Sequence, residues 1–280
     1  TKLNQIKYFS DGNSATLAGS SVFTSSISAS NNPYYYGITD GDPNSSRFDT
    51  QFYVSWGHIK GSGSNTYNDT IKGSSEAIYR QYASMLLDDN EIEKGFLISS
   101  GSEVRTDLKN GTPDEWIYVL NLKKSGFEDQ VQNGSWTLQL SGSSVGGNGK
   151  TIYLTDNSVI RTNPPIVTDA GRRFDIISGS GGQSYTGYSK IGGRYGFFYP
   201  DAGLMVFGEK LTTEFKSLPQ PSDVGVFDSG SAGNNQLFPI TSSNADGKNA
   251  IRFINTLRNV DGNSFNLYGE KELTSTIYVC

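Results

Sequence analysis

The amino-acid sequence predicts an α+β protein that is mainly β, with antiparallel meander or sandwich-like sheets, two short helices and long loops rich in Gly, Ser and Asn. The chain of 280 residues contains 33 Gly and 2 Met, a composition that disfavours helices and favours tight turns. It also contains 16 Tyr and 15 Phe, which are residue types that favour strands. Short apolar runs alternate with turn signals along the chain, as is typical of strands joined by loops. A helical bundle and a doubly wound nucleotide-binding fold are therefore excluded as the main architecture.

The first half of the chain divides into an arm and a mixed region. Residues 1–46 are polar and rich in turn signals, so we expect an extended N-terminal arm whose aromatic side chains pack on something else. Residues 47–125 are a predicted strand–helix–strand region. Apolar residues at every second position predict a half-buried strand over 47–56. Ile78, Tyr82 and Leu86 recur at helical spacing and predict a helix over 76–87, followed by strands over 96–98 and 116–120.

The second half divides into a hairpin-rich region and a mixed C-terminal region. Residues 126–195 contain apolar runs that predict strands over 136–140, 151–154, 166–167 and 174–177. Residues 196–280 are predicted to contain strands over 196–200, 203–207 and 265–268, a loop over 216–248 and a helix over 249–258. The sequence stops inside the apolar run 276–280. We therefore expect that it is truncated at Cys280 and belongs to a longer protein.

The net charge, the cysteine count and the lengths of the apolar runs argue against several kinds of partner and structure. The formal net charge is −5, which argues against nucleic acid as a partner. The single cysteine, Cys280, cannot form an intrachain disulfide. The sequence has no apolar run long enough to span a bilayer, so no membrane span is expected.

Two stretches resemble known ligand-binding loops but lack residues that those loops require. Residues 144–151 resemble a phosphate-binding loop, yet Ser144 stands where the first glycine is needed and a strand follows where a helix is required. A hairpin is the better prediction for this stretch. Residues 40–51 resemble a calcium loop, but Ser45 and Gln51 stand where Gly and Glu are needed. An ordinary turn is predicted there, and no cofactor or metal is expected.

The chain shows no organised catalytic cluster. His58 is the only histidine, and a structural role with a hydrogen bond to a backbone carbonyl is the favoured interpretation. Paired carboxylates for glycoside hydrolysis would have to come from three acidic clusters, at 88–93, 114–115 and 128–129. The cluster at 88–93 follows a helix and is expected to be a solvated charged turn. We therefore expect that the protein is not an enzyme.

Aromatic residues set among Asn, Ser and Gly suit a protein interface, a carbohydrate-binding face or a plain β core, and composition does not separate the three. The candidate interface residues are Phe23, Tyr34, Tyr35, Tyr36, Tyr185 and Tyr188.

Several stretches resemble a family of virion structural proteins from contractile-tailed, T-even-like phages, including those that infect cyanobacteria. The stretches are VSWGH at 54–58, SEAIYRQYA at 75–83 with MLL at 85–87, GSWTL at 134–138, YPDAGLMVF at 199–207 and LTSTIY at 273–278. The resemblance implies a tail or baseplate component located in the virion, which is assembled in the host cytoplasm. It implies copies of itself and other virion proteins as partners. It carries over no enzymatic residues.

Three hypotheses follow, in order of preference. The first is a non-enzymatic structural subunit of a phage tail or baseplate in a symmetric assembly, with the arm and the 216–248 loop against neighbouring chains. The second is a glycan-binding module for host attachment that uses Tyr34, Tyr35, Tyr36, Tyr185 and Tyr188, and a glycan array would reveal it. The third is a β-rich glycan hydrolase, which needs a pocket with two carboxyl groups about 5–10 Å apart.

Overall fold

The computed structural model describes residues 2–8, 22–24, 35–39, 50–61, 73–99, 111–127, 129–144, 146–185, 193–215, 218, 245–257 and 265–271. Within these residues the protein is mainly β, and every strand pair is antiparallel. The predicted fold class is confirmed.

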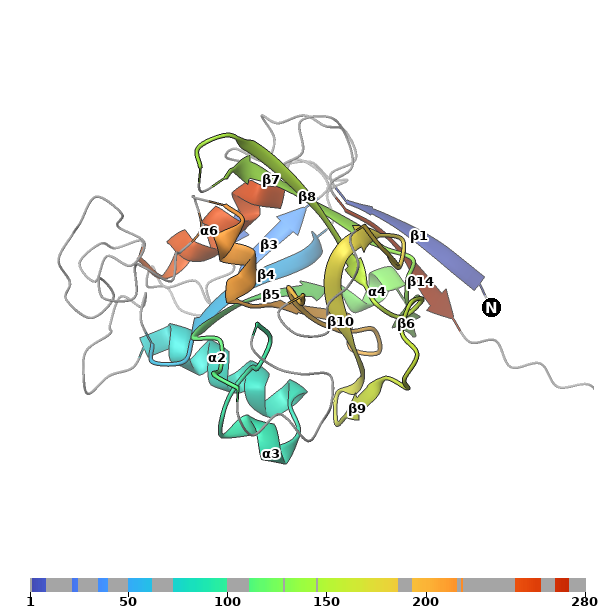
Figure 1. Cartoon of the computed structure of the whole chain (residues 1–280), viewed down its shortest axis with the longest axis horizontal. Helices are drawn as coiled ribbons and strands as arrows, with labels where there is room; N and C mark the ends of the chain where they lie inside the picture. Colours follow the sequence, from blue (N-terminus) through green and yellow to red (C-terminus); the bar gives the residue numbers. More distant parts are fainter. Residues whose placement is uncertain are drawn as a thin grey trace, which may run out of the picture.

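The strands belong to one sheet (Figure 1). They are β1 (Lys2–Tyr8), β2 (Val22–Thr24), β3 (Tyr36–Thr39), β4 (Thr50–His58), β5 (Trp116–Leu122), β6 (Gln130–Val131), β7 (Thr137–Ser143), β8 (Gly149–Asp156), β9 (Ile166–Thr168), β10 (Gly171–Ser180), β11 (Gln183–Ser184), β12 (Gly196–Tyr199), β13 (Leu204–Phe207) and β14 (Phe265–Lys271). Their order in the described chain is β1-β14-β7-β8-β10-β12-β13-β5-β4-β3-β2, with β6 beside β14, and β9 and β11 beside β10.

Helices cover both faces of the sheet. The helices are α2 (Gly73–Leu86), α3 (Asp89–Ile92), α4 (Lys124–Phe127) and α6 (Ala245–Leu257), with a 3₁₀ helix η1 (Glu209–Thr213). In Figure 1, α2 and α3 lie on one side of β4 and β5, and α6 lies on the other side. In the described part of the chain no helix is both long enough and apolar enough to cross a membrane.

The central strands bury side chains on both faces. On β5, Trp116, Tyr118 and Leu120 join a cluster that includes α6, whereas Ile117 and Val119 join a second cluster against α2. Alternate residues of a strand point to opposite faces of its sheet. The unbroken apolar runs in β5, β12 and β13 are therefore explained by burial on both sides.

The sheet curls around the cluster that contains α6. Phe52 of β4 and Phe265 of β14 meet edge to face, with ring centroids 6.1 Å apart, although their strands stand near opposite ends of the strand order. Phe253 of α6 stacks on Tyr118 at 4.9 Å and lies 5.5 Å from the ring of Phe207. The helix thus fills the concave side of the sheet.

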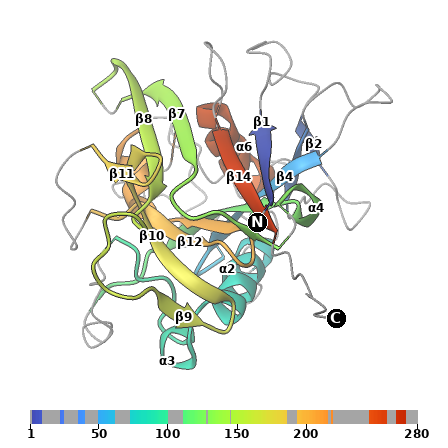
Figure 2. The ribbon, with the colours of Figure 1, turned by 90° about the vertical axis from the view of Figure 1, so that its right-hand side faces the viewer.

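The N-terminal region differs from the extended arm that the sequence predicts. Its described parts are strands of the chain's own sheet, because β1 pairs with β14 and β3 pairs with β4. Ile38 of β3 is 1% exposed and belongs to the cluster with α6. Figure 2 shows β1 beside β14, so segments from the two ends of the chain lie side by side.

The strand predicted over residues 96–98 is wrong. This buried segment pairs with none of the described strands, because side chains and the backbone N–H of Asp114 take up its backbone groups. The Phe96 N–H donates to the Tyr79 hydroxyl at 3.0 Å, and the carbonyls of Leu97 and Ile98 accept hydrogen bonds from Arg194. Periodicity identified the apolar run correctly but could not show that another part of the chain satisfies its backbone.

Candidate functional site

A pocket with a volume of about 670 Å³ opens between α2 and strands β4 and β5. Its described lining residues come from four segments of the chain: Tyr35, Tyr53, Ser55, Ile78, Gln81, Tyr82 and Asn121. Tyr53 and Ser55 are alternate residues of β4, so both point to the sheet face that α2 covers. Asn121 of β5 lies directly opposite Tyr53 in the strand register. Residues 78, 81 and 82 lie on one face of α2, because helical neighbours are three and four positions apart.

The aromatic walls of the pocket are held in place by their neighbours. The rings of Tyr35 and Tyr53 meet at 90° with centroids 5.3 Å apart. Gly37 stands opposite Tyr53 in the register, and a Cβ there would lie 3.5 Å from the Tyr53 ring. Burial raises the pKa of the Tyr82 hydroxyl, and the neighbouring side chains of Ser55 and Asn121 partly oppose this shift. The pocket therefore offers fixed rings and neutral hydrogen-bonding groups.

The structure describes the side chains of two of the six predicted interface residues, and these two lie at different places. Tyr35 lines the pocket. Tyr185 lies elsewhere, 58% exposed, with its ring 5.9 Å from that of Tyr153, which is 37% exposed. Phe23 and Tyr36 lie in β2 and β3, but their side chains are outside the described part of the structure, as are Tyr34 and Tyr188 altogether.

Sequence reasoning missed most of the pocket. Tyr53, Tyr82 and Asn121 carry no motif, and they meet only through the register of β4 with β5 and the position of α2. One signal was available: Tyr53 is an aromatic residue on the otherwise polar face of the predicted strand over 47–56. Such a residue has to be covered by another element or by a ligand.

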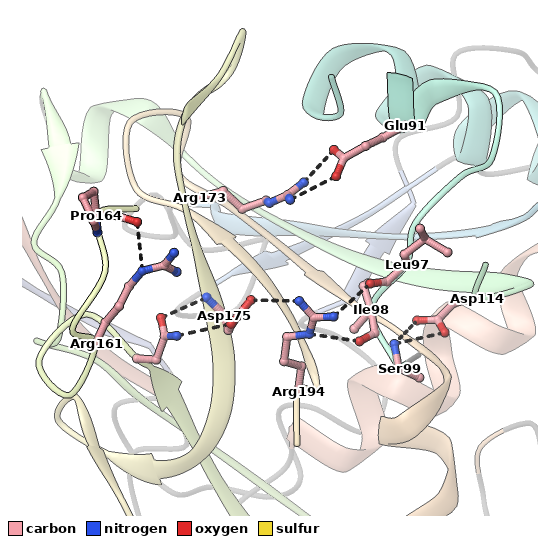
Figure 3. A network of polar contacts seen from close by, with 11 residues as sticks. Glu91, Leu97, Ile98, Ser99, Asp114, Arg161, Pro164, Arg173, Asp175 and Arg194 are labelled. Carbon is pink, nitrogen blue, oxygen red and sulfur yellow. Dashed lines mark hydrogen bonds and ion pairs between the residues drawn. The ribbon is translucent and has the colours of Figure 1, made fainter. Parts of the chain in front are cut away.

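A network of buried charges joins α3, β10 and the segment at 96–99 (Figure 3). Arg173 of β10 donates two hydrogen bonds to Glu91 of α3, at 2.8 and 3.1 Å, and lies 4.5 Å from the centre of the Phe197 ring. Arg194 approaches Asp175 at 3.5 Å, and Asp175 in turn accepts a hydrogen bond from the Asn157 side chain at 3.2 Å. The prediction that residues 88–93 form a solvated charged turn is therefore wrong for Glu91. This glutamate is buried because it has a partner 82 residues later in the chain.

The candidate carboxylates for hydrolysis do not line the pocket in the described residues. Asp114 is buried and accepts a hydrogen bond from the backbone N–H of Ser99, with N–O distances of 3.3 and 3.2 Å to its two carboxylate oxygens. Burial, together with the nearby charge of Glu209, raises the pKa of Asp114 to about 7. The carboxyl group thus stabilises the segment at 96–99 through its hydrogen bond with Ser99.

Asp114 gives the fold a specific dependence on pH. Below about pH 4 the carboxyl group is protonated in both folded and unfolded chains. As the pH rises to about 7 the unfolded chain releases this proton while the folded chain retains it, so the contribution of Asp114 to stability is lost across that interval. Urea denaturation from pH 4 to 8 should show that Asp114→Asn has a flatter stability profile than the wild type. Equal slopes in the two proteins would contradict this assignment.

The other sequence motifs have structural roles where they are described. His58 is buried, its Nδ1 accepts a hydrogen bond from the Lys60 N–H at 3.0 Å, and burial with the Lys60 charge lowers its pKa to about 3. The neutral structural role is thus supported, with a backbone N–H as a partner rather than the carbonyl that we expected. The phosphate-loop resemblance at 144–151 is a β7–β8 hairpin, in which Ser143 faces Gly149. The calcium-loop resemblance at 40–51 falls mostly outside the described residues, and the described part contains no cluster of His, Cys, Asp or Glu suited to a metal ion.

Comparison with known proteins assigns no family. No protein-family model matches the chain, and neither curated proteins nor solved structures give a significant match.

Proposed function

We propose that the chain is a non-enzymatic structural subunit of a phage virion, in the tail or baseplate, that acts through contacts with copies of itself and with other virion proteins. The resemblance to virion proteins motivates this proposal, and the edges of the sheet support it. Among the described strands, β1 pairs only with β14, and β2 pairs only with β3. One side of each outer strand therefore carries N–H and C=O groups that no described strand takes up.

An open edge is a surface on which a strand of another chain can add. Both outer strands come from residues 1–46, so this region contributes strands to the chain's own sheet and also presents its two edges. Repetition of such a contact by symmetry gives a ring or a stack of subunits. The single observation that carries the proposal is the placement of β1 and β2 at the two ends of the sheet.

Cross-linking mass spectrometry of purified virions tests this proposal. We expect peptides of the chain in the particles and cross-links from Lys2 or Lys7 of β1 to a neighbouring subunit. Lys94, beside α3, is the control position and should form fewer cross-links between subunits. Absence of the chain from virions would contradict the assignment, and cross-links confined to one copy would contradict the contact through β1.

A matched pair of proline variants isolates the edge contact in the purified chain. Neighbouring N–H groups of an antiparallel strand point to opposite sides. One of the substitutions Asn4→Pro and Gln5→Pro therefore removes a hydrogen bond to β14, and the other removes an N–H donor on the outer edge of β1. We expect one variant to lose thermal stability. The variant that keeps its stability should weaken self-association by about tenfold, the equivalent of roughly 1.4 kcal/mol. If both associate like the wild type in analytical ultracentrifugation, the edge of β1 is not the contact.

A further inference from the structure

The pocket beside α2 has a composition that the assembly role does not require. It is enclosed by three tyrosine rings, and its described lining contains no Asp, Glu, Lys, Arg or His. Its volume of about 670 Å³ falls within the range of small-molecule sites, which is roughly 300–1,000 Å³. Both the shape and the neutrality of the lining bear on what can bind there.

Charged and purely apolar ligands fit this lining poorly. A phosphate or carboxylate group would leave water without a counter-charge from the described lining, which is costly. A wholly apolar ligand would remove water from Gln81, Asn121 and the tyrosine hydroxyls while giving them no hydrogen-bond partner. The lining favours a neutral ligand that carries many hydroxyl groups.

A saccharide has both properties that the pocket selects. Its ring presents apolar C–H faces that pack on aromatic rings, and its hydroxyls both donate and accept hydrogen bonds. The amides of Gln81 and Asn121 also donate and accept, and the perpendicular rings of Tyr35 and Tyr53 form two faces for stacking. The rings of Tyr35 and Tyr53 already pack on each other before any ligand arrives, which reduces the entropy lost on binding.

We infer that the pocket between α2 and strands β4 and β5 is a binding site for a neutral oligosaccharide, with Tyr53, Gln81 and Asn121 as its principal contacts. Of the five tyrosines named from the sequence, Tyr35 belongs to the described lining of this site. It does not depend on the virion assignment, because the lining chemistry is the same whatever the chain assembles with.

Calorimetric titration of the whole chain tests the inference. The probes are maltohexaose, cellohexaose and chitohexaose as neutral oligosaccharides, with oligogalacturonate as the anionic comparison. We expect at least one neutral probe to bind and the anionic probe to bind more weakly. Tyr53→Ala should weaken the affinity by about tenfold or more, and Gln81→Ala by about three- to tenfold. Gln81 is exposed on α2, so its variant keeps the fold.

The matched control is Tyr185→Ala, which changes the exposed pair of Tyr153 and Tyr185 and should leave the affinity unchanged. Failure of all neutral probes to bind at millimolar concentration would overturn the inference. So would binding that Tyr53→Ala and Gln81→Ala do not affect, or that Tyr185→Ala abolishes. If Gln81→Ala instead reduces self-association while no sugar binds, the pocket is a contact between protein chains.

Discussion

Replacing Glu91 by alanine is expected to lower the free energy of unfolding by about 3–5 kcal/mol, because the substitution leaves the charge of Arg173 buried without its partner. The two side chains are 7% and 2% exposed, and they form two hydrogen bonds in parallel. Arg173 also lies against the Phe197 ring, so the guanidinium cannot move to water without disturbing the cluster around α2. Urea denaturation at pH 7 measures the loss.

Two further variants show whether burial causes this loss. Glu76→Ala removes an exposed pair with Arg80, in which the side chains are 21% and 47% exposed, and it should cost no more than about 0.5 kcal/mol. The double variant Glu91→Leu with Arg173→Leu should recover much of the stability, because neither charge is then left unpaired. A loss below about 1 kcal/mol for Glu91→Ala would show that solvent reaches Arg173.

The elements of the fold followed from local patterns in the sequence, whereas their order in the sheet did not. The apolar runs at 116–120 and 203–207 predicted β5 and β13 correctly, because strand preference is a property of neighbouring residues. That β13 pairs with β5, and β1 with β14, depends on contacts between distant parts of the chain. Periodicity carries no information about such pairings.

The candidate site was only partly predictable for the same reason. Tyr35 stood out because it belongs to a run of three tyrosines. Tyr53 and Asn121 become a pair only when β4 and β5 align in register. Glu91 resembled any surface carboxylate in the sequence, since its partner Arg173 lies on β10, far along the chain. Residues whose role depends on a distant partner are invisible to local patterns.

Replacing Phe253 by alanine is expected to lower the free energy of unfolding by about 3–5 kcal/mol, the usual cost of a large-to-small change at a fully buried aromatic residue. Phe253 is 0% exposed and lies against the rings of Tyr118 and Phe207. Its ring joins α6 to β5 and β13, so its loss leaves a cavity on the concave side of the sheet. Urea denaturation gives the magnitude, and near-ultraviolet circular dichroism reports the environment of Tyr118.

Phe253→Leu is the matched control, because leucine keeps an apolar side chain that fills most of the space. It should cost less than about 1.5 kcal/mol, as conservative core substitutions do. The difference between the two variants measures how much the sheet depends on being filled from its concave side. If alanine and leucine at position 253 give equally stable proteins, the Phe253 ring is not what holds α6 against the concave side of the sheet.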